Sequence, residues 1–196
     1  MNIRLADIKD AAQIAKIHQH EINQGFLGQL GPKFLLKLYE SMINSDSAFV
    51  TVADKDDQII GFVGGCTDVG KFYKNFYKKY AVSAFFILLP KIFNLSNLKK
   101  IFETLKYSKQ KKEKIPEAEL LTIAVLKEFH GQDIALKMFE HFVQEMKKRK
   151  IKEFKVLVGE NLSRAIRFYE KMGFEFHSLT SVHQDKSSKI YLYNIK

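Results

Sequence analysis

Residues whose types and spacing could carry chemistry are concentrated between Glu119 and Phe174. The first half of this region has the pattern of a strand, a tight turn and a helix, and the second half that of a strand, a helix and a turn. A turn that leads into a helix N-terminus can hold a phosphate, because its backbone N–H groups are unpaired and the helix dipole favours an anion. Tyr169, near the end of the second helix, can serve as a placed proton donor. The region therefore predicts binding of a phosphorylated cofactor and transfer of a group from it.

The rest of the pattern supplies the elements that must position these residues. Apolar runs predict strands at residues 3–5, 48–53, 58–67, 119–125, 154–158, 174–179 and 189–195. Apolar residues at helical spacing predict helices over 8–23, from Pro32 through Met42, over 131–150, and from the N-cap Asn161 to a stop at Gly173. The sum is a single mixed α/β domain over residues 1–196, with about seven strands and four main helices.

A basic, aromatic-rich segment at about residues 70–115 interrupts this domain. Between Lys71 and Lys114 there are 12 lysines and 2 acidic residues, so this segment carries the whole net charge of +10. Helices are expected over 72–89 and 95–107. Three interpretations are open: a helical hairpin packed on the domain, a lid over an acceptor site, or a surface for an anionic membrane. We favour the lid, with weak membrane contact through 71–114, and expect no nucleic acid because the sequence has no such motif.

Cysteine content and hydropathy limit the cellular setting. The single cysteine, Cys66, excludes an internal disulfide and indicates a reducing compartment. The first residues lack the apolar stretch of a signal peptide. The longest apolar run, residues 81–89, is shorter than the ~20 residues that span a bilayer. We therefore expect a cytoplasmic protein, and the oligomeric state stays open.

The region from Glu119 to Phe174 resembles the GNAT superfamily of N-acetyltransferases, and the resemblance covers most of the chain apart from the insertion. In that family, a turn of the form Arg/Gln-x-x-Gly-x-Gly/Ala holds the pyrophosphate of acetyl-CoA, and the preceding strand receives the pantetheine arm through its backbone. A later Asn-x-x-x-Ala-x-x-x-Tyr element matches Asn161, Ala165 and Tyr169, and a Glu-Lys-x-Gly-Phe sequence follows at 170–174. The second element is the more specific of the two.

The resemblance implies a GNAT-like central twisted mixed sheet, acetyl-CoA as cosubstrate and no metal. It also implies the residues that bind the cofactor. These are Ile123, Ala124, Val125, His130, Gly131, Gln132, Asp133, Ile134, Ala135, Asn161 and Tyr169.

Two residues of the turn depart from the family pattern. His130 stands where the family has Arg or Gln, and Asp133 replaces the first glycine of the motif. A glycine lets the backbone N–H groups approach a phosphate closely, whereas a carboxylate beside a pyrophosphate repels it. Asp133 also has a purely structural interpretation, since an acidic residue in the first helical turn complements the helix dipole. We therefore expect a cofactor site that binds weakly if Asp133 points inward.

Two residues are candidates for catalysis. The resemblance implies that Tyr169 is the general acid that returns a proton to the CoA thiolate; the alternative is a tyrosine that fills core space. Glu119 lies where some family members use a carboxylate, often through water, to take a proton from the acceptor amine. The alternatives are a solvated charge at the strand end, or the same role for Glu117.

The chemistry that results is acetyl-CoA-dependent N-acetylation by direct attack of an acceptor amine on the thioester. The stretch from Phe26 to Leu35 resembles a bacterial subgroup linked to cell-surface sugar modification, which suggests an amino sugar or nucleotide amino sugar as the small-molecule acceptor. A peptide N-terminus or a polyamine comes next. The alternative function is a catalytically weak or inactive GNAT-fold protein whose basic insertion binds an anionic membrane or another polyanion.

Overall fold

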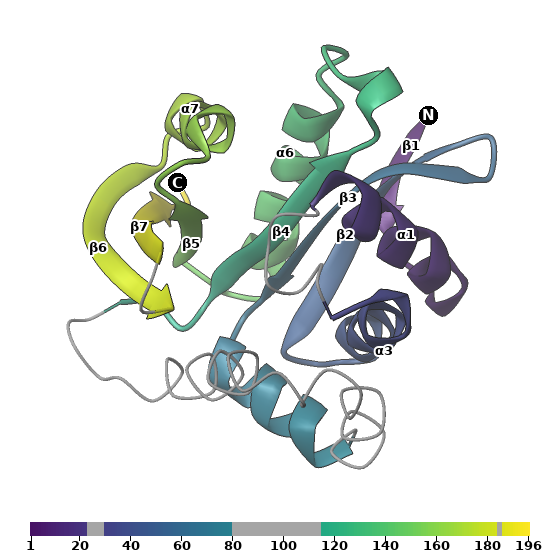
Figure 1. Cartoon of the computed structure of the whole chain (residues 1–196), viewed down its shortest axis with the longest axis horizontal. Coiled ribbons are helices and arrows are strands. Elements are labelled where there is room, and N and C mark those ends of the chain that lie inside the picture. The colour runs from purple at the N-terminus through teal and green to yellow at the C-terminus, as the bar shows by residue number, and fades with distance from the viewer. Residues whose placement is uncertain (23–29, 80–114, 184–185) are drawn as a thin grey trace.

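A seven-stranded mixed sheet forms the centre of the computed structural model, which describes residues 1–22, 30–79, 115–183 and 186–196 (Figure 1). The strand order is β1-β2-β3-β4-β5-β7-β6, and every pair is antiparallel except β4–β5, which is parallel. The strands are β1 (Asn2–Leu5), β2 (Ala48–Lys55), β3 (Gln58–Cys66), β4 (Glu119–Val125), β5 (Glu153–Gly159), β6 (Glu175–His183) and β7 (Lys186–Asn194). The predicted mixed α/β class and the seven strands are confirmed.

Helices cover both faces of the sheet. The labelled α-helices are α1 (Ala11–Glu21), α3 (Pro32–Ile43), α6 (Ile134–Lys148) and α7 (Ser163–Lys171), with short 3-10 turns at Ile8–Asp10 and Lys127–Phe129. α1 and α3 lie against one face and α6 against the other (Figure 1). Residues 69–79 form a fifth helix, drawn in teal, which is the start of the expected insertion. The predicted four main helices and an insertion helix agree with this arrangement.

Some boundaries differ from the sequence prediction. The expected first helix over 8–23 begins as a 3-10 turn before α1, and α6 begins at Ile134 rather than at residue 131. The reason for the later start is the positive φ of Gly131 (80°) and Asp133 (55°), which is incompatible with an α-helix. Residues 80–89 of the first expected insertion helix, the expected helix at 95–107 and most of the loop at 24–31 lie outside the described residues.

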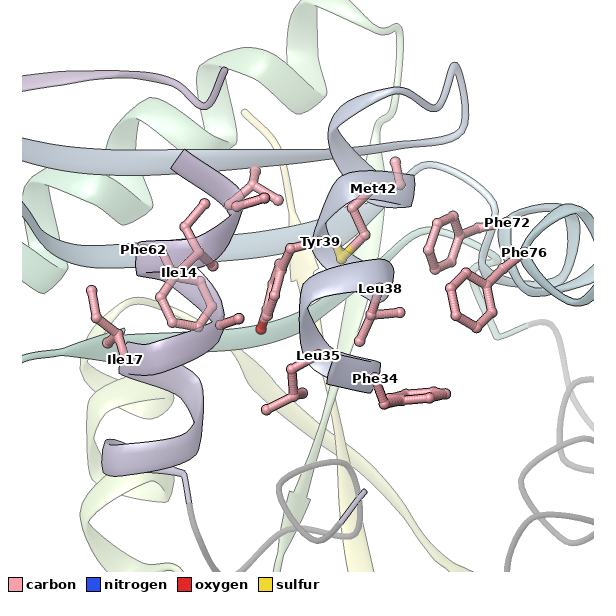
Figure 2. Packing of buried hydrophobic residues seen from close by; sticks show 14 of the residues in the cluster. Ile14, Ile17, Phe34, Leu35, Leu38, Tyr39, Met42, Phe62, Phe72 and Phe76 are labelled. Carbon is pink, nitrogen blue, oxygen red and sulfur yellow. The ribbon is translucent and has the colours of Figure 1, made fainter. Parts of the chain in front are cut away.

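The core on the α1 and α3 side includes the start of the insertion. Pro32 occupies the first turn of α3, and the predicted apolar stripe of this helix is buried. Figure 2 shows Tyr39 between the two helices and Phe72 and Phe76, from the 69–79 helix, beside Phe34 and Leu38. The packed interpretation of the insertion therefore describes residues 69–79. No helix of the described residues is long and apolar enough to cross a membrane.

A second core lies between the sheet and α6. The buried stripe of α6 includes Met138, Phe139 and Phe142, which pack against Phe154 of β5 and Phe174 before β6. These ring pairs fix α6 across the middle of the sheet, because aromatic side chains bury a large area in defined geometry. The N-terminus of α6 is thereby held at the end of β4.

Candidate functional site

A wedge opens between β4 and β5 and contains the candidate site. The two strands pair only at Glu119 with Lys155 and at Leu120 with Val156, and they diverge beyond these residues (Figure 1). Leu121 also has no partner in β3, because the register shifts between Gly64 and Gly65. A cavity of about 460 Å³ fills the wedge between β4, the turn before α6, and α7. Such a split parallel pair leaves backbone N–H and C=O groups free to bind an extended ligand.

The structure brings most of the predicted cofactor residues to this cavity. Its lining includes Ile123, Ala124, Val125, His130, Gly131, Asp133, Ile134, Ala135 and Tyr169. Gln132, Asn161 and Glu119 are not among the lining residues. The pocket therefore unites the two sequence elements that were singled out separately, the turn after β4 and the helix that carries Tyr169.

The turn before α6 presents free backbone donors to the cavity. The first intrahelical bond recorded at this end runs from the Lys137 N–H to the Asp133 carbonyl, at 3.0 Å. The N–H groups of the first helical residues, 134–136, precede this bond and have no intrahelical acceptor. Gly131, with φ of 80°, faces open space, since a Cβ built there would meet no atom within 4 Å. This geometry suits an anionic group at the mouth of the wedge.

Asp133 itself adopts a left-handed conformation, with φ of 55° and ψ of 16°. Aspartate is among the few residues other than glycine that tolerate this region, so the chain can adopt this conformation here without a glycine. Its side chain is exposed and makes no capping hydrogen bond. The turn thus contains a left-handed residue directly before α6, and its carboxylate adds a negative charge at the cavity.

His130 is held by two hydrogen bonds at this mouth. Its Nε2 lies 2.7 Å from the Val125 carbonyl oxygen, and its Nδ1 lies 3.2 Å from Nη2 of Arg164. A carbonyl only accepts and a guanidinium only donates, so Nε2 carries the hydrogen and Nδ1 accepts from Arg164. The imidazole in this arrangement connects β4 and α7, and neither of its ring nitrogens has an N–H left to offer an anion.

Tyr169 lies on the buried face of α7. It is 6% exposed and lines the cavity, with the rings of Phe168 and Phe174 centred 5.6 and 5.2 Å away. Burial raises the pKa of its hydroxyl well above the ordinary value of a tyrosine. The hydroxyl is therefore protonated at neutral pH and available as a hydrogen-bond donor.

The predicted N-cap role of Asn161 is wrong. α7 begins at Ser163, its N-cap position is Leu162, and no side chain caps it. The helix is entered one residue later than expected, and the Leu162 N–H donates to the Gly159 carbonyl at 2.9 Å just before it. Asn161 is exposed, and its Oδ1 lies over Gly159, 3.0 Å from where a Cβ would be.

Glu119 is a buried carboxylate at the closed end of the wedge. It is 7% exposed, and its Oε2 lies 3.6 Å from Nζ of Lys155, its neighbour across the β4–β5 pair. Oε2 has no hydrogen-bond partner among the described residues, while Lys155 donates to the Pro116 carbonyl. Burial raises the pKa of Glu119 to about 7, and the nearby ammonium of Lys155 opposes this rise. The carboxylate can therefore exchange a proton near neutral pH.

Two cationic residues of the cavity were missed by the sequence prediction. Arg164 and Lys171 both line it, and they lie on the same face of α7 as Phe168, at spacings of four and three residues. This helical spacing was a signal in the sequence that could have identified them. Among the described residues, no cluster of His, Cys, Asp and Glu could hold a metal ion.

Comparisons with known proteins agree with this geometry. Residues 15–174 match the sequence profile of the Acetyltransferase (GNAT) family. The search of curated proteins found no match.

Solved structures share the fold at low sequence identity. An acetyltransferase of GNAT family from Streptococcus pneumoniae is similar with a TM-score of 0.61 and 14% identity, over 100% of this chain and 99% of that chain. PaiA N-acetyltransferase from Thermoplasma acidophilum, solved in complex with coenzyme A, has a TM-score of 0.62 and 15% identity, over 99% of each chain. The ribosomal-protein-S18-alanine N-acetyltransferase from Escherichia coli has a TM-score of 0.62 and 14% identity, over 100% and 94%.

Proposed function

The chain belongs to the GNAT family of acetyltransferases, and from this premise we propose that it transfers the acetyl group of acetyl-CoA to the amine of a small molecule. The observation that carries the proposal is the cavity between β4 and β5. Its lining combines the unpaired edge of β4, the N-terminus of α6 and the buried Tyr169. The neighbour from Thermoplasma acidophilum, which was solved with coenzyme A, supports the choice of cosubstrate.

The residues of the wedge offer groups for two parts of acetyl-CoA. Backbone groups of Ile123, Ala124 and Val125 would hold the extended pantetheine arm. The turn at 130–135 would hold the pyrophosphate with its free N–H groups. Bound there, acetyl-CoA supplies an acetyl thioester whose carbonyl carbon is open to an amine. The exposed carboxylate of Asp133 opposes this binding to the extent that salt does not screen it.

Two residues would move protons during the transfer. As the amine nitrogen attacks the carbonyl carbon, the C–N bond forms and the C–S bond breaks. Glu119 would accept the proton lost by the amine through a water molecule, to which its unpartnered Oε2 could bind. Tyr169 would donate to the leaving sulfur; the same dry surroundings that raise the pKa of its hydroxyl also raise the basicity of a thiolate.

An amino sugar or a nucleotide amino sugar is the acceptor that we propose first. The 69–79 helix is held beside the start of β4, because the Val69 N–H donates to the Glu117 carbonyl at 3.0 Å. Its Lys71, Lys74 and Lys78 side chains are exposed. These cations suit an anionic nucleotide sugar better than a polyamine, which they would repel.

The test is a thiol-release assay with acetyl-CoA and four classes of amine: nucleotide amino sugars, free amino sugars, polyamines and peptides with a free N-terminus. We expect turnover with the first class at the lowest acceptor concentration. Calorimetry with acetyl-CoA and CoA accompanies the assay. Absence of cofactor binding at millimolar ligand would contradict the proposal of acetyl transfer itself. Turnover of polyamines alone would contradict only the proposal that the acceptor is an amino sugar.

A further inference from the structure

The contact between Arg164 and His130 bridges the two walls at the mouth of the wedge. His130 follows β4 and Arg164 lies in the first turn of α7, so the two residues come from opposite walls of the cavity that both of them line. Their side chains meet at 3.2 Å between Nδ1 and Nη2. This contact places a guanidinium next to the turn whose backbone donors precede α6.

Arg164 is a cation that the altered turn itself does not supply. The ring nitrogens of His130 are both occupied, since Nε2 donates to Val125 and Nδ1 accepts from Arg164. Asp133 adds a negative charge on the same rim. Arg164 keeps its charge at every physiological pH, and a guanidinium has five N–H donors, of which the bond to His130 uses one. The others can form a fork with two oxygens of a phosphate.

We propose that Arg164 binds the pyrophosphate of acetyl-CoA and that His130 is a positioning residue that aims the guanidinium at it. The proposal rests on the proposed function, because it takes the wedge as the cofactor site. It explains how a turn that carries Asp133 can still attract a dianionic group: the missing positive charge comes from α7, on the opposite wall of the cavity.

The test compares Arg164→Gln with Arg167→Gln by calorimetry. Arg167 lies one turn further along the same helix, is exposed and does not line the cavity, so it controls for a general loss of charge. The ligands are CoA, dephospho-CoA, which lacks the 3′-phosphate, and pantetheine, which lacks all phosphates. We expect Arg164→Gln to weaken the binding of CoA and dephospho-CoA by about 10- to 100-fold and to leave the affinity for pantetheine unchanged. Arg167→Gln should change the affinity for none of the three ligands by more than about twofold.

Each other outcome overturns a defined part of the inference. An effect on CoA that disappears with dephospho-CoA would move the Arg164 contact to the 3′-phosphate. Equal effects of both arginine variants, or none from either, would remove the assignment while the wild-type protein still bound CoA. If the wild-type protein binds no CoA, the proposed function fails instead.

A double-mutant cycle tests the part played by His130. If this residue acts by holding Arg164, His130→Ala should weaken CoA binding in the wild-type background and should cause little further loss of affinity in the Arg164→Gln background. Pantetheine affinity should stay the same in all four proteins, which a structural collapse of the turn would not allow. Additive losses for CoA would contradict the positioning role and assign His130 a separate contact.

Discussion

At the scale of single residues, the buried hydroxyl of Tyr169 carries the clearest mechanistic expectation. A tyrosine whose pKa is raised by burial holds its proton firmly, so its contribution is a hydrogen bond that strengthens as negative charge develops on the leaving sulfur. Tyr169→Phe should lower kcat by about 10- to 100-fold. This effect is at or below the lower end of those known for general acid–base catalysis, because a thiolate is a good leaving group even without a proton. The affinity for CoA should change little. Stopped-flow thiol release and calorimetry measure the two quantities.

Tyr191→Phe is the matched control for this change. Tyr191 is buried to a similar degree, but its hydroxyl donates to Glu170 at 2.9 Å and does not line the cavity. We expect normal turnover from this variant. An equal loss of kcat in both variants would show that removing a phenol hydroxyl acts through stability, and an unchanged rate for Tyr169→Phe would discard the acid role.

The pH dependence of the reaction should report Glu119. Its pKa is raised to about 7, so the basic carboxylate form gains population as the pH rises through 7, and kcat/KM should rise over the same interval. Lys155→Met removes the cation that favours the ionised form, so the pKa of Glu119 rises further. The rising limb should then move to higher pH, with about a tenfold loss of rate at pH 6.5 for each pH unit moved.

Lys152→Met provides the comparison, because Lys152 is exposed and just precedes β5. Its pH–rate curve should coincide with that of the wild type. Glu119→Gln should remove the rising limb altogether. A limb near pH 7 that persists in Glu119→Gln would assign the base to another group.

At the scale of elements, variants of the turn between β4 and α6 allow the effect of backbone conformation on CoA binding to be measured separately from the effect of charge. Asp133→Asn removes the negative charge but keeps a residue that tolerates the left-handed region, and Asp133→Gly removes the charge and any strain. Both variants should bind CoA about three- to tenfold more tightly than the wild-type protein at low salt. This gain in affinity should shrink as the salt concentration rises, because salt screens the carboxylate of the wild-type protein. Calorimetry at two ionic strengths measures this. Tightening by the glycine variant alone would show that backbone strain, and not charge, limits the site.

The elements themselves were largely predictable, and the reason is local. The apolar stripe of α3 and the apolar run of β4 are properties of neighbouring residues, and both elements formed where they were expected. Asn161 shows the limit of such reasoning. Asparagine is a favoured cap, yet the Leu162 N–H bonds to the Gly159 carbonyl, and the N-cap position falls on Leu162, one residue later than predicted.

The site depends on relations between elements that no local pattern contains. The wedge exists because β4 and β5 part after Leu120, and Arg164 meets His130 only because α7 is placed across that wedge. Their sequence separation of 34 residues hides this contact. The motif residues were found because their spacing within each element is regular, whereas the cation that complements them lies on the other wall.

At the scale of the whole molecule, the sheet separates two cores, and Gly65 of β3 is where α6 and β4 approach this strand very closely. A Cβ at this residue would lie 2.6 Å from two ring carbons of Phe142 in α6 and 2.7 Å from the Glu119 carbonyl oxygen in β4. Neither a strand backbone nor a fully buried ring can yield easily. Gly65→Ala should therefore destabilise the protein by about 3 kcal/mol, which corresponds to a Tm roughly 6–12 °C lower for a chain of this size.

Gly64→Ala provides the control on the opposite face of the same strand. Its Cβ would meet the Met42 methyl group at 3.0 Å, and a methionine end can shift, so the expected loss is about 1 kcal/mol or less. Thermal unfolding followed by circular dichroism and by aromatic fluorescence should give one coincident transition for each variant, because residues of β3 belong to both cores. Separate transitions from the two probes would show that the two faces of the sheet do not unfold cooperatively. A larger loss of stability in Gly64→Ala than in Gly65→Ala would show that the close approach at Gly65 does not hold β4 in place.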